Sequence, residues 1–73
     1  MRPFNLEEAK AGKPVCTRSG RAARIVCFDK LGSFPVVALV KDGYNESVIC
    51  YRTNGGVSIM KGHEHRDDLF LKD

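Results

Sequence analysis

The sequence lacks several features that mark common protein classes. It has no tryptophan, and its three cysteines are an odd number without a Cys-x-x-C pair, the spacing typical of zinc and redox sites. No apolar run approaches the roughly 20 residues of a membrane-spanning helix. The first residues, Met1-Arg2-Pro3-Phe4-Asn5, lack the apolar region of a signal peptide. We therefore expect a cytoplasmic protein that does not contact membranes and whose cysteines stay reduced.

The machinery of an enzyme is also missing. A chain of 73 residues holds one small domain, residues 1–73, and is too short for a cofactor crevice between two larger halves. The glycines stand at scattered positions, without a P-loop, a nucleophile elbow or an oxyanion loop. Cys16, Cys27 and Cys50 each lie in an apolar stretch, which is typical of buried structural thiols. We expect no enzymatic activity, no cofactor and no small-molecule substrate.

The first residues predict a short helix over 5–12. Asn5 suits its N-cap, Glu8 follows three residues later as in a capping box, and Gly12 suits the left-handed exit. A helix of about two turns is not stable alone in water, so it must dock on the rest of the chain.

Antiparallel strands are predicted over residues 13–60. Turn residues at Ser19-Gly20, Asp42-Gly43 and Asn54-Gly55 separate apolar segments. The expected strands are 14–18, 21–28, 34–41, 46–52 and 57–60. Pro35 must stand at the start of its strand, because proline gives the ladder no donor.

The remaining residues, 61–73, form a polar loop that ends in an apolar patch, Leu69-Phe70-Leu71, expected as a last short strand. So few residues must curl to enclose a core, so the fold class is mainly β: an antiparallel meander curled into an SH3-like open barrel with a short N-terminal helix. Alternation places Ala23, Ile25 and Cys27 on one face of their strand, and Arg24, Val26 and Phe28 on the other. Residues 36–40 are apolar on both faces, which predicts a second cover, from the helix and tail or from another subunit.

Positive charge is concentrated in one segment. The net charge is +3, and the stretch from Ala9 to Phe28 has five basic residues and no acidic one. They are Lys10, Lys13, Arg18, Arg21 and Arg24. This pattern is compatible with phosphate contacts on a nucleic acid. A solvated hairpin that stays soluble would have the same composition, and no aromatic residue stands between Phe4 and Phe28 to stack on bases.

Two further groups are weaker candidates. Tyr44 and Tyr51 are amphipathic rings of the kind enriched at protein interfaces, although Tyr51 could simply cover the barrel. His63 and His65 stand at i and i+2, where a strand places both imidazoles on one face. Two histidines make an incomplete ligand set, so we predict no metal site.

Three motifs together carry a resemblance: Thr17-Arg18-x-Gly20-Arg21, the run Ile-Val-Cys-Phe-Asp at 25–29, and Asp68-Leu69-Phe70. With them the chain resembles a group of small uncharacterised bacterial and bacteriophage proteins. The resemblance implies a phage or mobile-element setting and supplies no catalytic residue.

These observations favour a non-enzymatic interaction module, which binds a protein partner or associates with itself as a homodimer through an exposed strand edge and apolar surface. The alternative is a nucleic-acid-binding protein that uses the basic residues 10–24.

Overall fold

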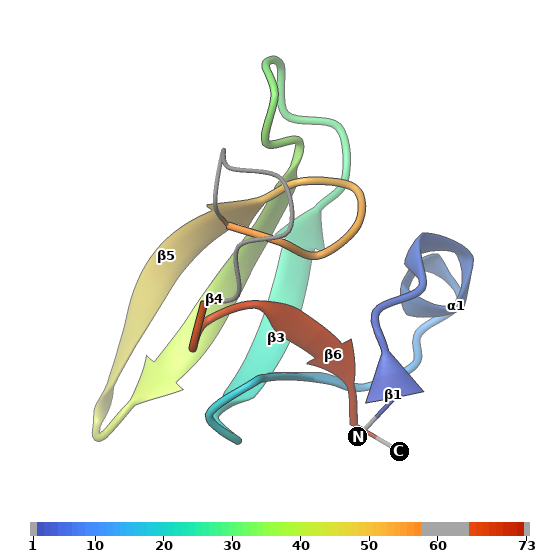
Figure 1. The fold of residues 1–73 in the computed structure, drawn as a ribbon. Coiled ribbons are helices and arrows are strands. Elements are labelled where there is room, and N and C mark those ends of the chain that lie inside the picture. The colour runs from blue at the N-terminus through green and yellow to red at the C-terminus, as the bar shows by residue number, and fades with distance from the viewer. Residues whose placement is uncertain (1, 58–64, 73) are drawn as a thin grey trace.

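The fold is one open antiparallel sheet with a short helix. The computed structural model describes residues 2–57 and 65–72. Within them the sheet has the strand order β1-β6-β2-β3-β4-β5. Figure 1 draws the fold as a ribbon. The elements are β1 (Arg2–Pro3), α1 (Leu6–Lys10), β2 (Val15–Thr17), β3 (Ala22–Cys27), β4 (Val36–Asp42), β5 (Asn45–Tyr51) and β6 (Leu69–Leu71). The predicted mainly β class with an N-terminal helix is confirmed.

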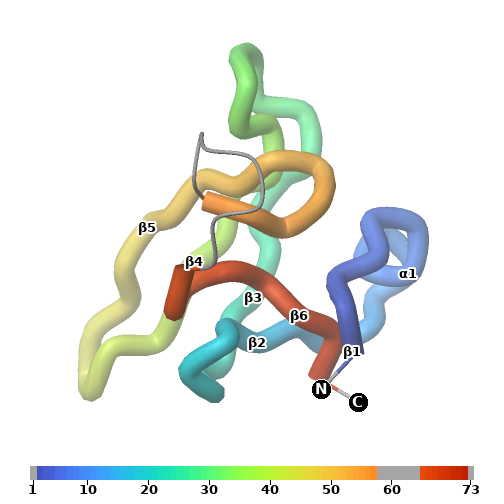
Figure 2. The backbone as a smooth tube through the Cα atoms, viewed as in Figure 1, coloured from blue at the N-terminus to red at the C-terminus, as the bar shows by residue number. Residues whose placement is uncertain are grey.

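The predicted meander corresponds to β2, β3, β4 and β5, which pair in chain order. β6 then returns from the far end of the sequence and pairs with β2, and β1 pairs with β6. β1 and β5 stand at the two ends of the sheet, so the sheet is not closed. Figure 2 shows the curled path of the backbone.

Local signals set the helix. The Asn5 side chain accepts a hydrogen bond from the Glu8 backbone N–H at 3.0 Å, as an N-cap requires. The Glu8 carboxylate pairs with Arg2 at 3.2 Å; among the described residues, no hydrogen bond from the Asn5 N–H to Glu8 completes a capping box. The chain leaves the helix through Gly12 at φ +99°, a conformation that favours glycine.

Turn chemistry places the hairpins as predicted. At the Ser19-Gly20 turn, the Thr17 N–H donates to the Arg21 carbonyl at 2.9 Å, and the Arg21 N–H donates to the Thr17 hydroxyl at 3.0 Å. Pro35 comes directly before β4, where its missing N–H costs no ladder bond. β4 and β5 then pair without a register shift along their whole length.

The core lies on one face of the curled sheet. Val36 and Ala38 from β4, Tyr51 from β5, and Leu69 and Leu71 from β6 are all at most 3% exposed. They belong to one cluster with Val15 and the helix residue Ala9. Because strands from both parts of the sheet contribute, this core forms only when β6 has returned to β2.

A β-bulge in β3 corrects the predicted alternation. Ile25 is opposite Ala38 but Cys27 is opposite Val37, so β3 has one residue more than β4 at this point. The extra residue reverses the faces beyond it. Phe28 therefore packs against the core, not on the face of Arg24 as alternation predicted.

The Asn54-Gly55 signal does form a turn, in which the Gly55 N–H donates to the Arg52 carbonyl at 2.9 Å. The predicted strand 57–60 is not found at Val57, which lies outside any strand, and its residues 58–60 lie outside the described residues. The C-terminal patch forms β6, as expected.

Candidate functional site

The outward side of β3, β4 and β5 carries a second apolar surface, which we call the outer face. The register places Leu39 opposite Arg24 and Val48, and Val37 opposite Cys27 and Cys50. Directly opposed residues of antiparallel strands project to the same side. The outer face consists of Val26, Cys27, Val37, Leu39, Val48 and Cys50.

The outer face is largely accessible to solvent. Val48 is 67% exposed and Val26 is 60% exposed, while Val37 and Leu39 are half-buried. The helix and β6 pack with the core residues, on the opposite side of the sheet. The sequence predicted that both faces of the central strands are covered. Among the described residues, the helix and the C-terminal strand cover only the face that carries the core.

One end of the outer face is polar. Arg24 binds Glu46 with two hydrogen bonds, Nε to Oε2 at 3.0 Å and Nη2 to Oε1 at 2.8 Å. The hydrogen bonds from Arg24 hold the pKa of the Glu46 carboxyl below its ordinary value of 4.5. Beside this pair, Leu39 and Lys41 help to line a shallow hollow of about 140 Å³. An apolar strip with a charged end is typical of a protein contact surface.

The cysteines do not share one environment. Cys16 is buried, as predicted, but Cys27 and Cys50 are half-buried and belong to the outer face. The prediction of three interior thiols is therefore wrong for two of them. The reason is the register, which places both thiols beside Val37 on the side of the sheet away from the core.

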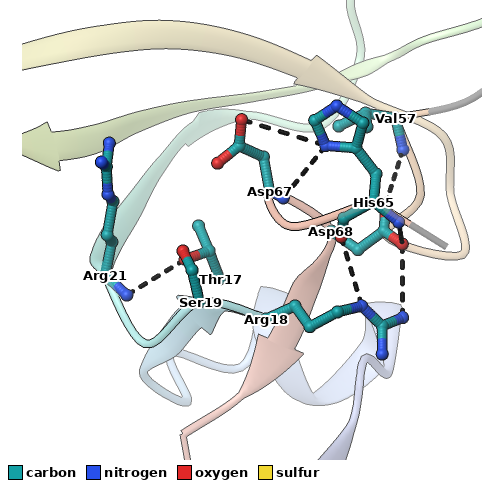
Figure 3. Close-up of polar contacts among 8 residues, drawn as sticks. All are labelled: Thr17, Arg18, Ser19, Arg21, Val57, His65, Asp67 and Asp68. Atoms are coloured by element: carbon teal, nitrogen blue, oxygen red, sulfur yellow. Dashed lines mark hydrogen bonds and ion pairs between the residues drawn. The ribbon is translucent and has the colours of Figure 1, made fainter.

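Arg18 is part of the structure that holds β6 in place, shown in Figure 3. Its guanidinium donates to the His65 carbonyl at 3.2 Å and to the Asp68 carboxylate at 3.4 Å, and it lies 4.7 Å from the centre of the Phe70 ring. The Asp68 carboxylate also accepts the backbone N–H groups of Val57 and His65, at 3.1 and 3.0 Å. Arg18 therefore connects the β2–β3 turn to the C-terminal segment.

The other predicted basic residues differ in the partners that they contact. Arg21 pairs with Asp42 at 3.4 Å, and Arg24 is held by Glu46 on the outer face. Lys10 and Lys13 are exposed; Lys13 lines a groove beside the helix, and the Lys10 ammonium lies 5.9 Å from the ring of Phe28, which lines the same groove. Three of the five cations therefore have an acidic partner within the chain, which lowers the charge that they offer to a phosphate backbone.

The two tyrosines lie in opposite environments. Tyr44 is fully exposed in the β4–β5 turn. Tyr51 is 0% exposed, so its ring packs in the core and does not form the predicted contact surface. Within the described residues its hydroxyl has no hydrogen-bond partner. Burial, with the nearby charges of Asp67 and Asp68, raises the pKa of this hydroxyl above its ordinary value of 10.0.

Of the two candidate histidines, the structure describes His65. The His65 Nδ1 accepts the Asp67 N–H at 3.1 Å and lies 4.0 Å from the Asp67 carboxylate. His63 lies outside the described residues. In residues 2–57 and 65–72, no group of three or more histidine, cysteine or acidic side chains is arranged to hold a metal ion.

Comparison with known proteins places the chain in a family. Residues 1–69 match the family described as Haemophilus phage HP1 protein YO09. The chain belongs to this phage family. No curated protein and no solved structure matches it. The resemblance to small phage proteins is thereby confirmed, and the description of the family names no enzymatic activity.

For this member of the phage family, sequence reasoning missed the position of the outer face. The apolar residues at 36–40 did signal a second apolar surface, but Val26 and the two half-buried thiols were not assigned to it.

No helix among the described residues is long and apolar enough to cross a membrane.

Proposed function

We propose that this phage protein is a non-enzymatic interaction module that binds a protein partner, or a second copy of itself, through the outer face. The observation that carries the proposal is the exposure of Val26 and Val48 beside Leu39, on a sheet whose core is already complete on the other side. Contiguous exposed apolar side chains on a small protein mark contact sites more often than chance exposure does.

The surroundings of the outer face support protein contact over catalysis. The apolar strip is bordered by the Arg24–Glu46 pair, whose side chains are both partly exposed. Such a border adds orientation at the rim of an interface, while the apolar centre supplies the favourable free energy. The alternative, nucleic-acid binding by Lys10, Lys13, Arg18, Arg21 and Arg24, stays a prediction with less support, because the three arginines have acidic partners in the chain.

The thiols provide a direct test of the outer face. Cys27 and Cys50 belong to it and Cys16 is buried, so a maleimide should label the first two and spare the third. We expect the labelling of Cys27 and Cys50 to slow when the protein is concentrated or mixed with host lysate. Mass spectrometry of each cysteine peptide gives the three rates separately, with Cys16 as the internal control for unfolding.

A charged residue in the apolar strip should abolish this protection. Val48→Glu places a carboxylate at an exposed position of the strip, whereas Leu31→Glu makes the same kind of change at a 92% exposed leucine in the β3–β4 loop. In Val48→Glu we expect the two thiols to lose their protection from maleimide, and in Leu31→Glu we expect them to keep it. Equal labelling rates at every concentration and in lysate, together with a monomeric mass by sedimentation, would refute the proposal.

A further inference from the structure

A groove lined by residues of the helix and of β3 lies beside β3, on the side of that strand where β2 pairs and away from β4. It has a volume of about 240 Å³. Its walls are mainly apolar and include Ala9 from the helix, Val15 from β2, and Ile25 and Phe28 from β3 and its end. None of the described acidic residues lines it.

The groove exists because β2 ends early. β2 pairs with β3 only at Val15–Ala23 and Cys16–Ala22, although β3 continues to Cys27. The preceding residues cannot extend the ladder: Pro14 has no N–H, and the Lys13 N–H already donates to the Glu8 carbonyl at 3.1 Å. Beyond Ala23, β3 therefore pairs with β4 alone among the described strands.

The alternating backbone hydrogen bonds between β2 and β3 show which backbone groups of β3 face the groove. Arg21 bonds to Thr17 through its backbone carbonyl, so the odd-numbered residues Ala23 and Ile25 direct their backbone groups to the β2 side. In the described parts of the chain, no backbone hydrogen bond joins Ile25 to Lys13 or Pro14. The N–H and C=O of Ile25 thus form a short strand edge inside an apolar groove.

The rim of the groove is positively charged. Lys13 and Arg24 line it, although Arg24 is already paired with Glu46. The Lys10 ammonium lies 5.9 Å from the centre of the Phe28 ring. Neither lysine forms a salt bridge with an acidic group in residues 2–57 and 65–72, and the nearby Glu8 carboxylate is taken by Arg2. Two exposed cations at an apolar groove favour a ligand that combines apolar and acidic groups.

We propose that this groove binds an extended peptide segment of a partner protein, in which an apolar residue is flanked by acidic residues. The peptide backbone pairs with Ile25 as an added strand, its apolar side chain lies among Val15, Ile25 and Phe28, and its carboxylates face Lys10 and Lys13. A peptide fits better than a nucleic acid, because a strand edge and apolar walls have no complement in a phosphate backbone. This site shares Arg24 with the polar end of the outer face, but none of the six apolar and cysteine residues of the outer face lines it.

The test is a selection from a displayed random heptapeptide library on the full chain. We expect enrichment of peptides with an apolar residue next to Asp or Glu. The double variant Lys10→Glu/Lys13→Glu should lower the affinity for a synthesised enriched peptide about tenfold and shift the selection toward basic peptides. The matched control, Lys30→Glu/Lys41→Glu, changes the net charge equally at two exposed lysines away from the groove and should leave the affinity unchanged.

Amide hydrogen exchange then tests the added strand. The bound peptide should slow exchange at Ile25 in the wild-type chain, because its N–H gains a partner. Enrichment without an acidic preference, an equal loss of affinity in both double variants, or unchanged exchange at Ile25 would overturn the proposal. Binding of mixed-sequence DNA that is lost in Lys10→Glu/Lys13→Glu, with no peptide enriched, would also overturn it, since the lysines would then serve phosphates. If Val48→Glu removes the protection of Cys27 and Cys50 from maleimide but still binds the peptide, the groove and the outer face are two independent sites.

Discussion

Asp68 is the residue whose replacement should reveal how the C-terminal segment is held. It is 8% exposed. From the described residues its carboxylate accepts three hydrogen bonds, two from the backbone N–H groups of Val57 and His65 and a longer one from Arg18 at 3.4 Å. Asp68→Ala leaves both N–H groups without this acceptor. Each lost amide bond costs about 1–1.5 kcal/mol, and the half-exposed Arg18 adds little because solvent screens its charge.

We therefore expect Asp68→Ala to lower the free energy of unfolding by about 2–3 kcal/mol. A chain of this length has a total stability of only roughly 4–11 kcal/mol, and such a loss lowers the Tm by about 10–20 °C. Urea denaturation followed by circular dichroism measures the change. Asp68→Asn, which keeps one acceptor oxygen, should lose about half as much.

Asp67→Ala is the matched control, because it removes the same charge one residue away. The Asp67 carboxylate lies 4.0 Å from the His65 Nδ1, so its loss should cost under about 1 kcal/mol. If both alanine variants unfold at the same urea concentration, the reasoning about the Asp68 contacts is wrong and charge alone explains the effect.

Three further outcomes are expected. In a carbon-13 NMR titration, the pKa of Glu46 lies below 4.5 and rises in Arg24→Ala. The stabilisation from this pair is present above the ordinary pKa of Glu46 and is lost as the pH falls through its lowered value. An unchanged pKa of Glu46 in the variant would contradict the bidentate contact. Gly55→Ala lowers the stability by about 1–3 kcal/mol, since the glycine has φ +86° and an added Cβ would lie 2.7 Å from the Phe4 Cβ. If the variant is as stable in urea as the wild type, the close contact is disproved. Tyr51→Phe leaves the stability unchanged within about 1 kcal/mol or raises it, because the buried hydroxyl has no hydrogen-bond partner within residues 2–57 and 65–72. The raised pKa of Tyr51 destabilises the fold as the pH rises above about 10, so the variant should also resist alkaline unfolding better than the wild type.

The elements that sequence analysis predicted correctly depend on near neighbours in the chain. Asn5 caps the helix, Ser19-Gly20 turns the first hairpin, and Pro35 precedes its strand, each through contacts within a few residues. The prediction of β6 from an apolar patch near the end was also correct. Its partner strand was not predicted, because the pairing with β2 joins residues more than 50 positions apart.

The roles of single side chains were predicted less well. For Tyr51 the sequence left open a contact surface or a cover of the barrel, and the ring is buried. Arg18 was a candidate for phosphate contact, and its guanidinium donates to the Asp68 carboxylate. Both outcomes follow from where β6 and its preceding turn lie, which composition and spacing do not specify. The bulge at β3 is a third case, since one extra residue moved Phe28 into the core.

The amino-acid order alone determined the class of this molecule: a short capped helix, tight glycine turns and apolar segments that build an antiparallel sheet, with a surplus of apolar residues on the central strand. Capping, turn geometry and alternation are local properties, so they can be read along the chain. Only the tertiary structure decided which apolar side remained uncovered, where the thiols came to lie, and that a gap opened beside β3. Those features arise from the register between distant strands and from the point where β2 ends, and register is set by the packing of the whole core.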